Sequence, residues 1–340
     1  MGITGHANLR LRAIARWRVE VREASLDSSV ISVDNYFAMQ STSSPIALIR
    51  IRRAQHLGMC FGVRDAIALA YEHAAERPLT ILGDLVHNAT VSADLRARGI
   101  AIAQDVADVK TTAVMVTAHG TSERALAQTR ALGFEVVEAT CPLVHVAHKA
   151  VRALVRDGYH PVIVGQRGHV EVRGLTGDLD KFDVVLDDKD VLLLEPHLRI
   201  GVAAQTTQSI ARVRHIVELI KRRFPDSVVR FVDTVCRPTK DRQIAAVELA
   251  SESDLIIVIG GANSNNTREL VNTCQRHCSR VYHVQTEADV QPEWFADVTT
   301  VGITAGTSTP DEVIDRVDRR VRELAGVREE DAVAQGVMDQ

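Results

Sequence analysis

The sequence predicts an α/β protein made of three small domains with mainly parallel sheets. From residue 79 onward, short runs rich in β-branched residues alternate with amphipathic stretches of helix length. This alternation is typical of parallel sheets covered by helices. Three cysteines, Cys60, Cys141 and Cys236, each close a β-rich run, and the gaps between them are 81 and 95 residues. Because each gap approaches the size of a small domain, the spacing predicts a pseudo-threefold arrangement of units that converge on one point.

The expected elements follow one another in a regular order along the chain. Strands are expected at residues 79–87, 113–120, 134–141, 160–166, 183–188, 199–207, 228–236, 254–261, 280–284 and 299–306. Helices are expected at residues 122–133, 146–158, 209–224 and 241–253. No linker rich in Pro, Gly or Ser is visible, so the cysteines place the domain boundaries better than composition does. The predicted domains are 46–141, 142–232 and 233–322.

Both ends of the chain differ in amino-acid composition from the part between them. Residues 1–45 are predicted to be an extension, because residues 1–19 hold four arginines and no acid, and the Ser-rich segment QSTSS follows. This composition faintly resembles an organelle transit peptide, although several acids follow and a secretory apolar region is missing. A non-native upstream start, with Met39 as the true initiator, is at least as good an interpretation. Residues 323–340 are predicted to be an acidic, frayed tail.

Composition narrows the class of protein. A net charge of −4 over 340 residues gives no bulk basic field for nucleic acid. No apolar stretch approaches the roughly 18 residues that a membrane span needs. Five scattered cysteines indicate a reducing compartment, and the expected location is the cytoplasm, with a plastid-type organelle as the lesser alternative. Cys274 and Cys278 flank His277 and could bind a metal, but two buried residues near a helix end are the preferred interpretation.

Polar side chains follow almost every expected strand. In open parallel sheets, ligands bind beyond the carboxyl ends of the strands, near the N-termini of the following helices. The residues at these positions are His87, Asn88, His119, Ser122, His169, Glu171, Gln205, Thr206, Thr207, Asn263, Ser264, Asn265, Asn266, Thr307 and Ser308. Any one Ser, Thr or Asn there is more often a simple helix N-cap. Together, three histidines with several hydroxyl and amide groups favour one polar pocket that suits a diphosphate.

The three isolated cysteines allow two kinds of metal site. A trio of thiolates can hold an iron–sulfur cluster with one iron that has no protein ligand. A zinc site of three cysteines and a histidine is the alternative, although zinc ligands usually come in close pairs. The H-x-E segment at His169 and Glu171 has no following P-C-x-x-C, which rejects deaminase chemistry. The sequence also has no Walker A loop, G-x-G-x-x-G or G-x-S-x-G motif.

A set of ordered motifs between Gly58 and Asp311 resembles the family of 4-hydroxy-3-methylbut-2-enyl diphosphate reductases, the last enzymes of the non-mevalonate isoprenoid pathway. The motifs, in family order, are C-x-G-V at 60–63, VHN at 86–88, AHG at 118–120, ATCPLV at 139–144, GH-x-E-V-x-G at 168–174, QTT at 205–207, C-x-x-T-x-x-RQ at 236–243, NS-x-N at 263–266 and TAG-x-S-x-PD at 304–311. So many matches in order are far more specific than any single motif.

The resemblance implies a trefoil of three α/β domains around a central [4Fe–4S] cluster. Cys60, Cys141 and Cys236 would be its ligands, one iron would remain without a protein ligand, and Glu171 would deliver protons. The implied substrate-binding residues are His87, His119, His169, Thr206, Ser264, Asn265, Asn266 and Ser308. The implied oxidoreductase reaction is a reductive dehydroxylation that yields isopentenyl and dimethylallyl diphosphate.

The resemblance also implies ferredoxin or flavodoxin as the electron donor, and no membrane or nucleic-acid partner. A non-catalytic iron–sulfur protein, such as a redox or iron sensor with the same fold, is the main alternative. Phe61, His145, Pro238 and Asn265 depart from the usual family residues. None of them replaces a predicted cluster ligand, so they bear on substrate geometry and product ratio.

Overall fold

The computed structural model describes residues 49–327, all of which belong to one compact unit. The predicted extension at 1–45 and most of the predicted tail lie outside the described residues. None of the helices within 49–327 is both long enough and apolar enough to cross a membrane.

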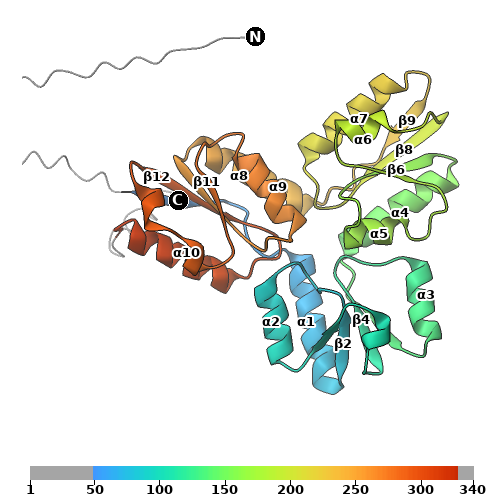
Figure 1. The fold of residues 1–340 in the computed structure, drawn as a ribbon, viewed down its shortest axis with the longest axis horizontal. Helices are drawn as coiled ribbons and strands as arrows, with labels where there is room; N and C mark the ends of the chain where they lie inside the picture. Colours follow the sequence, from blue (N-terminus) through green and yellow to red (C-terminus); the bar gives the residue numbers. More distant parts are fainter. Residues whose placement is uncertain (1–48, 328–340) are drawn as a thin grey trace, which may run out of the picture. The chain divides into compact units, whose positions relative to one another are not determined.

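The described residues form three sheets of four strands each, and every strand pair is parallel (Figure 1). The first sheet has the order β3-β2-β4-β5, the second β7-β6-β8-β9 and the third β1-β12-β10-β11. The strands are β1 (Arg50–Arg53), β2 (Leu79–Leu82), β3 (Ala101–Ala103), β4 (Ala113–Val116), β5 (Glu135–Glu138), β6 (His160–Val164), β7 (Asp183–Val185), β8 (Arg199–Ala204), β9 (Val228–Phe231), β10 (Leu255–Ile259), β11 (Val281–Val284) and β12 (Thr300–Ala305). This architecture confirms the predicted fold class.

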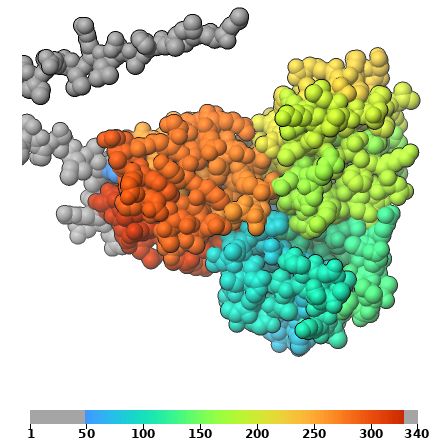
Figure 2. Space-filling view, viewed as in Figure 1, coloured from blue at the N-terminus to red at the C-terminus, as the bar shows by residue number. Residues whose placement is uncertain are grey.

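Helices connect nearly all of the strands. The α-helices are α1 (Phe61–Glu76), α2 (Ala89–Ala97), α3 (Glu123–Ala131), α4 (Pro142–Arg156), α5 (Val170–Thr176), α6 (Asp188–Leu192), α7 (Ile210–Arg223), α8 (Arg237–Ser251), α9 (Asn265–Cys274) and α10 (Asp311–Leu324). Short 3₁₀ turns at Val106–Asp108, Glu287–Asp289 and Pro292–Phe295 complete the connections. Figure 2 shows that the three parts of the chain that form the three sheets touch one another.

Each sheet has its own apolar core. Strand β10 has no exposed side chain, because it is central in its sheet and helices cover both faces. The amphipathic helix α7 buries Val213, Ile216, Val217 and Ile220 against β8, as its periodicity requires. Such separate cores are expected where three small sheets share one chain.

Every expected strand contains an observed one and every expected helix overlaps one, although α4 and α8 each begin four residues before the expected start. Two strands were not predicted. Strand β3 is only three residues long, too short to give a pattern. Strand β1 has the sequence RIRR, in which three charged residues of four give no apolar strand pattern. It pairs with β12, so the described chain begins in the third sheet and then passes to the first. The predicted domain boundaries stay a prediction.

Candidate active site

One pocket lies where the carboxyl ends of the three sheets meet. All of the residues that the family resemblance implies for the site line it, namely Cys60, His87, His119, Cys141, His169, Glu171, Thr206, Cys236, Ser264, Asn265, Asn266 and Ser308. They come from loops that follow strands in all three sheets. The structure therefore brings the predicted residues together, as the rule for open parallel sheets leads one to expect. Their chemical roles stay predictions.

Each of the three cysteines is the N-cap residue of a helix. Cys60 precedes α1, Cys141 precedes α4 and Cys236 precedes α8. None uses its side chain to cap the helix, so the thiols remain available to a ligand. The partial positive charge of a helix N-terminus favours a thiolate over a thiol.

Gly62 explains why the first motif needs a glycine two residues after Cys60. A Cβ atom at this position would lie 2.4 Å from the Sγ atom of Cys141. Only glycine lets the thiol of the second cysteine approach the first turn of α1 so closely. Gly62 is thus a residue that brings two predicted ligands together, and the C-x-G-V motif was its signal in the sequence.

Burial acts against ionisation of two of these thiols. It raises the pKa of Cys141, although the backbone N–H groups of Leu143 and Val144 oppose the effect. Burial also raises the pKa of Cys236 to about 11, against the contribution of a hydrogen bond with Thr239 at 3.1 Å. Both thiols are therefore neutral at pH 7 unless a cation or cluster binds them. A soft, positively charged metal group fits this donor set.

Arg242, a residue outside the predicted site, holds two of the cysteine loops in place. Arg242 is buried, and its Nε and Nη2 atoms donate to the carbonyl oxygen of Gly58 at 3.0 and 2.7 Å. This contact ties α8, which begins after Cys236, to the loop that carries Cys60. Arg242 belongs to the C-x-x-T-x-x-RQ motif, so the sequence held a signal for it without showing its partner.

Three imidazoles form a triangle at one side of the pocket. The ring centroids of His87 and His119 are 4.3 Å apart, those of His87 and His169 5.1 Å, and those of His119 and His169 5.7 Å. Burial lowers the pKa of His87, drives that of His119 well below its usual value and lowers that of His169 to about 3. The trio is therefore neutral at pH 7 when no anion is bound.

The tautomer of His169 follows from its own helix. His169 is the N-cap of α5, and its Nδ1 atom accepts the backbone N–H of Glu171 at 3.1 Å. Because Nδ1 accepts, the proton of the neutral ring is on Nε2, which makes that atom a donor. Arg268, which sequence reasoning missed, lines an adjoining pocket with His87 and His169 and hydrogen-bonds Gln166. It adds positive charge beside the imidazoles.

Glu171 is almost fully buried, with 1% of its surface exposed. Its Oε1 atom accepts the backbone N–H of Thr206 at 2.6 Å. Burial raises the pKa of Glu171 to about 7, although the hydrogen bonds from Thr206 oppose the rise. A carboxyl group with a pKa near 7 can hold and release a proton at neutral pH.

The third sheet contributes hydroxyl and amide groups to the pocket. Ser264 is the N-cap of α9, and Asn266 is buried with neither its Oδ1 nor its Nδ2 atom bonded to another described residue. The Nε2 atom of His87 is likewise buried without such a bond. Buried polar groups without partners cost free energy, so these atoms favour a polar ligand.

Asn265 and Ser308 make contacts between segments of different sheets. The Nδ2 atom of Asn265 donates to the carbonyl oxygen of Thr207 at 3.0 Å, which joins the third sheet's loops to the second's. Ser308 donates to the carbonyl oxygen of His87 at 3.3 Å, which joins them to the first. Both side chains therefore hold the pocket together in addition to lining it.

Three other sequence candidates have structural roles. Asn88 and Ser122 are N-caps of α2 and α3, which is the simpler alternative for such residues. Cys274 is fully buried in an apolar cluster that includes Cys278, and burial raises its pKa to about 12. This cluster supports the interpretation of the pair as core residues.

Three parallel sheets that share one pocket at their carboxyl ends, with a cysteine at each of three helix N-termini, define a narrow class of α/β proteins. The chain belongs to the LytB protein family, whose model matches residues 51–322. The reductase from Pelobacter propionicus, named 4-hydroxy-3-methylbut-2-enyl diphosphate reductase, is 36% identical over 278 residues, which cover 81% of this chain and 99% of the relative. The protein of the same name from Aquifex aeolicus is 36% identical over 283 residues, 82% of this chain and 97% of the relative.

Solved structures agree with this assignment. The E-1-hydroxy-2-methyl-but-2-enyl-4-diphosphate reductase from Plasmodium falciparum matches with a TM-score of 0.76 at 26% identity, over 81% of this chain and 88% of that one. A second structure, titled (E)-4-hydroxy-3-methyl-but-2-enyl diphosphate reductase, the terminal enzyme of the non-mevalonate pathway, matches with a TM-score of 0.60 at 36% identity. That match covers 81% of this chain and 99% of the other.

Proposed function

We propose that this chain catalyses the reductive dehydroxylation of 4-hydroxy-3-methylbut-2-enyl diphosphate. The reaction consumes two electrons and two protons, breaks the C–O bond of the alcohol, forms a C–H bond and releases water. Its products are isopentenyl and dimethylallyl diphosphate, the precursors of isoprenoids. The observation that carries the proposal is that three thiols, three imidazoles and one buried carboxyl group line a single pocket.

Cys60, Cys141 and Cys236 would hold a [4Fe–4S] cluster. When bound, this cluster would supply the electrons and, at an iron without a protein ligand, a Lewis acid for the substrate alcohol. The fit rests on the donor set: three thiols at helix N-termini, with Gly62 leaving room for the thiol of Cys141. The other two cysteines of the chain lie in an apolar core and offer no fourth ligand here.

Glu171 would hold the proton that the leaving hydroxyl group needs. Its pKa of about 7 keeps a large share of the carboxyl groups protonated at neutral pH. Thr206 fixes the carboxyl group through its backbone N–H, and the hydroxyl group of Thr206 would bind near the substrate alcohol. Both residues are buried, so the carboxyl group has little contact with bulk water.

The diphosphate would bind to the imidazoles of the pocket and to its amide and hydroxyl groups. His87, His119 and His169 offer ring N–H donors, and the buried amide of Asn266 has no other partner among the described residues. A dianionic group would also raise the pKa of these imidazoles, so protonation on binding would strengthen the contacts. Ser264, Asn265 and Ser308 would complete the set. Ferredoxin or flavodoxin would be the electron donor.

The experiment is an anaerobic turnover assay with a reduced viologen, the allylic alcohol diphosphate and product analysis. Cys141→Ser should lose bound iron and turnover, whereas Cys278→Ser should keep both. Cys278 is the matched control because it lies in an apolar cluster away from the pocket, where its Sγ atom hydrogen-bonds the carbonyl oxygens of Ser253 and Arg280. A serine hydroxyl can make the same contacts.

The two alternatives predict different results in the same assay. A non-catalytic sensor would retain iron and its visible absorption but give no turnover in the wild-type protein. A zinc site would give neither iron nor visible absorption. Glu171→Gln should keep the iron and the diphosphate affinity and lose turnover, and unchanged turnover would remove its role as proton donor.

A further inference from the structure

A second group of possible metal ligands lies at the amino ends of strands β6, β7 and β8 in the second sheet. His160 is the first residue of β6, Asp183 is the first residue of β7, and His197 lies two residues before β8. Of the site residues described above, His169 and Glu171 follow the other end of β6 and Thr206 follows that of β8. Because a strand rises about 3.3 Å per residue, the five residues of β6 separate the two places by roughly 15 Å.

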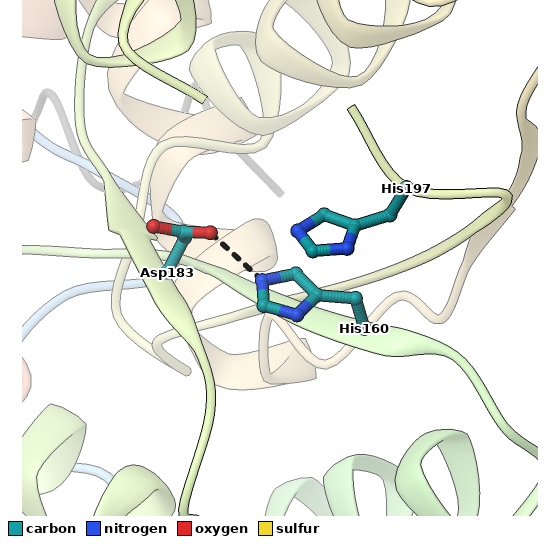
Figure 3. A group of neighbouring side chains, drawn as sticks. All are labelled: His160, Asp183 and His197. Atoms are coloured by element: carbon teal, nitrogen blue, oxygen red, sulfur yellow. Dashed lines mark hydrogen bonds and ion pairs between the residues drawn. The ribbon is translucent and has the colours of Figure 1, made fainter. Parts of the chain in front are cut away.

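The three side chains converge on a common point. One ligand atom from each of His160, Asp183 and His197 lies within 4.8 Å of the other two. Figure 3 shows the His197 ring over the His160 ring, with a nitrogen of each on the side of the Asp183 carboxylate. The Nε2 atom of His160 is 2.7 Å from Oδ2 of Asp183, and the two ring centroids are 3.7 Å apart.

The backbone holds this group firmly. The sheet order β7-β6-β8 places the first two residues on neighbouring strands, where Val162 lies opposite Asp183 and His160 opposite Ile200. The loop that carries His197 is tied down by the hydroxyl group of Ser227, which donates to the carbonyl oxygen of His197 at 2.6 Å. The positions of the three Cα atoms are thus set by sheet pairing and one loop anchor.

We propose that His160, Asp183 and His197 bind a divalent transition-metal ion of the zinc class. Two imidazoles and a carboxylate are a common zinc set, which leaves a fourth position for water. Magnesium and calcium prefer oxygen ligands, so the two ring nitrogens select against them. All three side chains are partly buried, so the ion would enter from solvent and lose part of its hydration there.

Only small movements are needed to form the site. A tetrahedral ion with bonds of about 2.1 Å separates its ligand atoms by about 3.3 Å. The nitrogen of His160 and the oxygen of Asp183 must therefore move apart by well under 1 Å, and His197 must turn toward them. The charged neighbours of His197 include Glu195 and Lys181 in addition to Asp183.

The test is equilibrium dialysis of the anaerobically purified protein against zinc, followed by mass spectrometry that measures the zinc and the iron bound per chain. The wild-type protein should bind one more zinc per chain than His197→Ala at the same iron content. Loss of this ligand should weaken the site by at least the roughly 10- to 100-fold that outer-shell changes cost. Turnover of His197→Ala should equal that of the wild-type protein, which also shows that the variant is folded.

His215 supplies the matched control. Its Nε2 atom is 2.7 Å from Oδ1 of Asp188 in the same α/β unit, but this exposed pair has no third ligand among the described residues. His215→Ala should therefore bind zinc like the wild-type protein. Equal zinc binding by the wild-type protein and His197→Ala, or an equal loss in His215→Ala, overturns the proposal. If His197→Ala does not fold, Asp183→Asn decides by the same comparison.

Discussion

The buried carboxyl group of Glu171 should make the folded protein less stable as the pH rises. Its pKa is about 7 in the folded protein, against an ordinary value of 4.5 in the unfolded chain. Between these values the folded protein holds a proton that the unfolded chain has lost, so the free energy of unfolding falls with rising pH. The loss is complete above about pH 7 and amounts to about 3 kcal/mol, at 1.36 kcal/mol for each pH unit between the two values.

Glu171→Gln removes this pH dependence because the amide has no proton to lose. Its side-chain oxygen can still accept the backbone N–H of Thr206. Relative to the wild-type protein, the variant should therefore gain most of the 3 kcal/mol between pH 5 and pH 8. In a protein of this size that corresponds to a Tm difference that widens by roughly 5–10 °C. The predicted proton donor thus lowers stability at neutral pH.

The assay is anaerobic scanning calorimetry of the wild-type protein and the variant at several pH values, at one scan rate. Glu248→Gln is the matched control, because it makes the same chemical change at an exposed side chain of α8. Its Tm should follow that of the wild-type protein at every pH. A Tm difference between Glu171→Gln and wild type that stays constant from pH 5 to pH 8 would refute the account of the buried charge.

Three further predictions concern the pocket. Gly62→Ala should lose bound iron although it changes no predicted ligand, because the new Cβ atom would lie 2.4 Å from Sγ of Cys141. Phe61→Ala is the control: it changes an exposed side chain in the same helical turn and should retain the iron. Asn266→Ala should raise the Kd for the substrate, or for inorganic diphosphate, by about 10- to 100-fold, since a hydrogen bond to a charged group is lost; an unchanged Kd by titration calorimetry contradicts this role. Turnover should fall about tenfold per pH unit above pH 7 as Glu171 loses its proton, and a flat profile from pH 7 to pH 9 argues against it as the acid.

The fold class could be predicted because the local patterns are strong. A run such as Leu255–Ile259 is buried from end to end, and only a central strand of a covered sheet provides that environment. The pairing of β1 could not be predicted in the same way. Its partner β12 lies some 250 residues later, and the three arginines among its four residues suit a position at the sheet edge.

The residues of the candidate site were predicted from two separate signals. Position after a strand identified His87 and Ser308 as candidates, but it gives no distance between residues of different sheets. Their proximity, with Ser308 bonded to the carbonyl oxygen of His87, depends on how the sheets pack. The ordered motifs of the family carried that information. His160 and His197 had no such signal, because strand order alone brings them together.

One physical cause, burial, sets the protonation of both kinds of acid in the pocket. It raises the pKa of the Cys236 thiol to about 11 and that of Glu171 to about 7. The helix N-termini oppose the effect at the cysteines without cancelling it, so a bound metal group must displace the thiol protons as it assembles. Glu171 lies close enough to interact with both Cys141 and Cys236. A carboxyl group whose pKa is near 7 can therefore keep its proton beside these ligands at neutral pH and still give it to an electron-rich substrate oxygen.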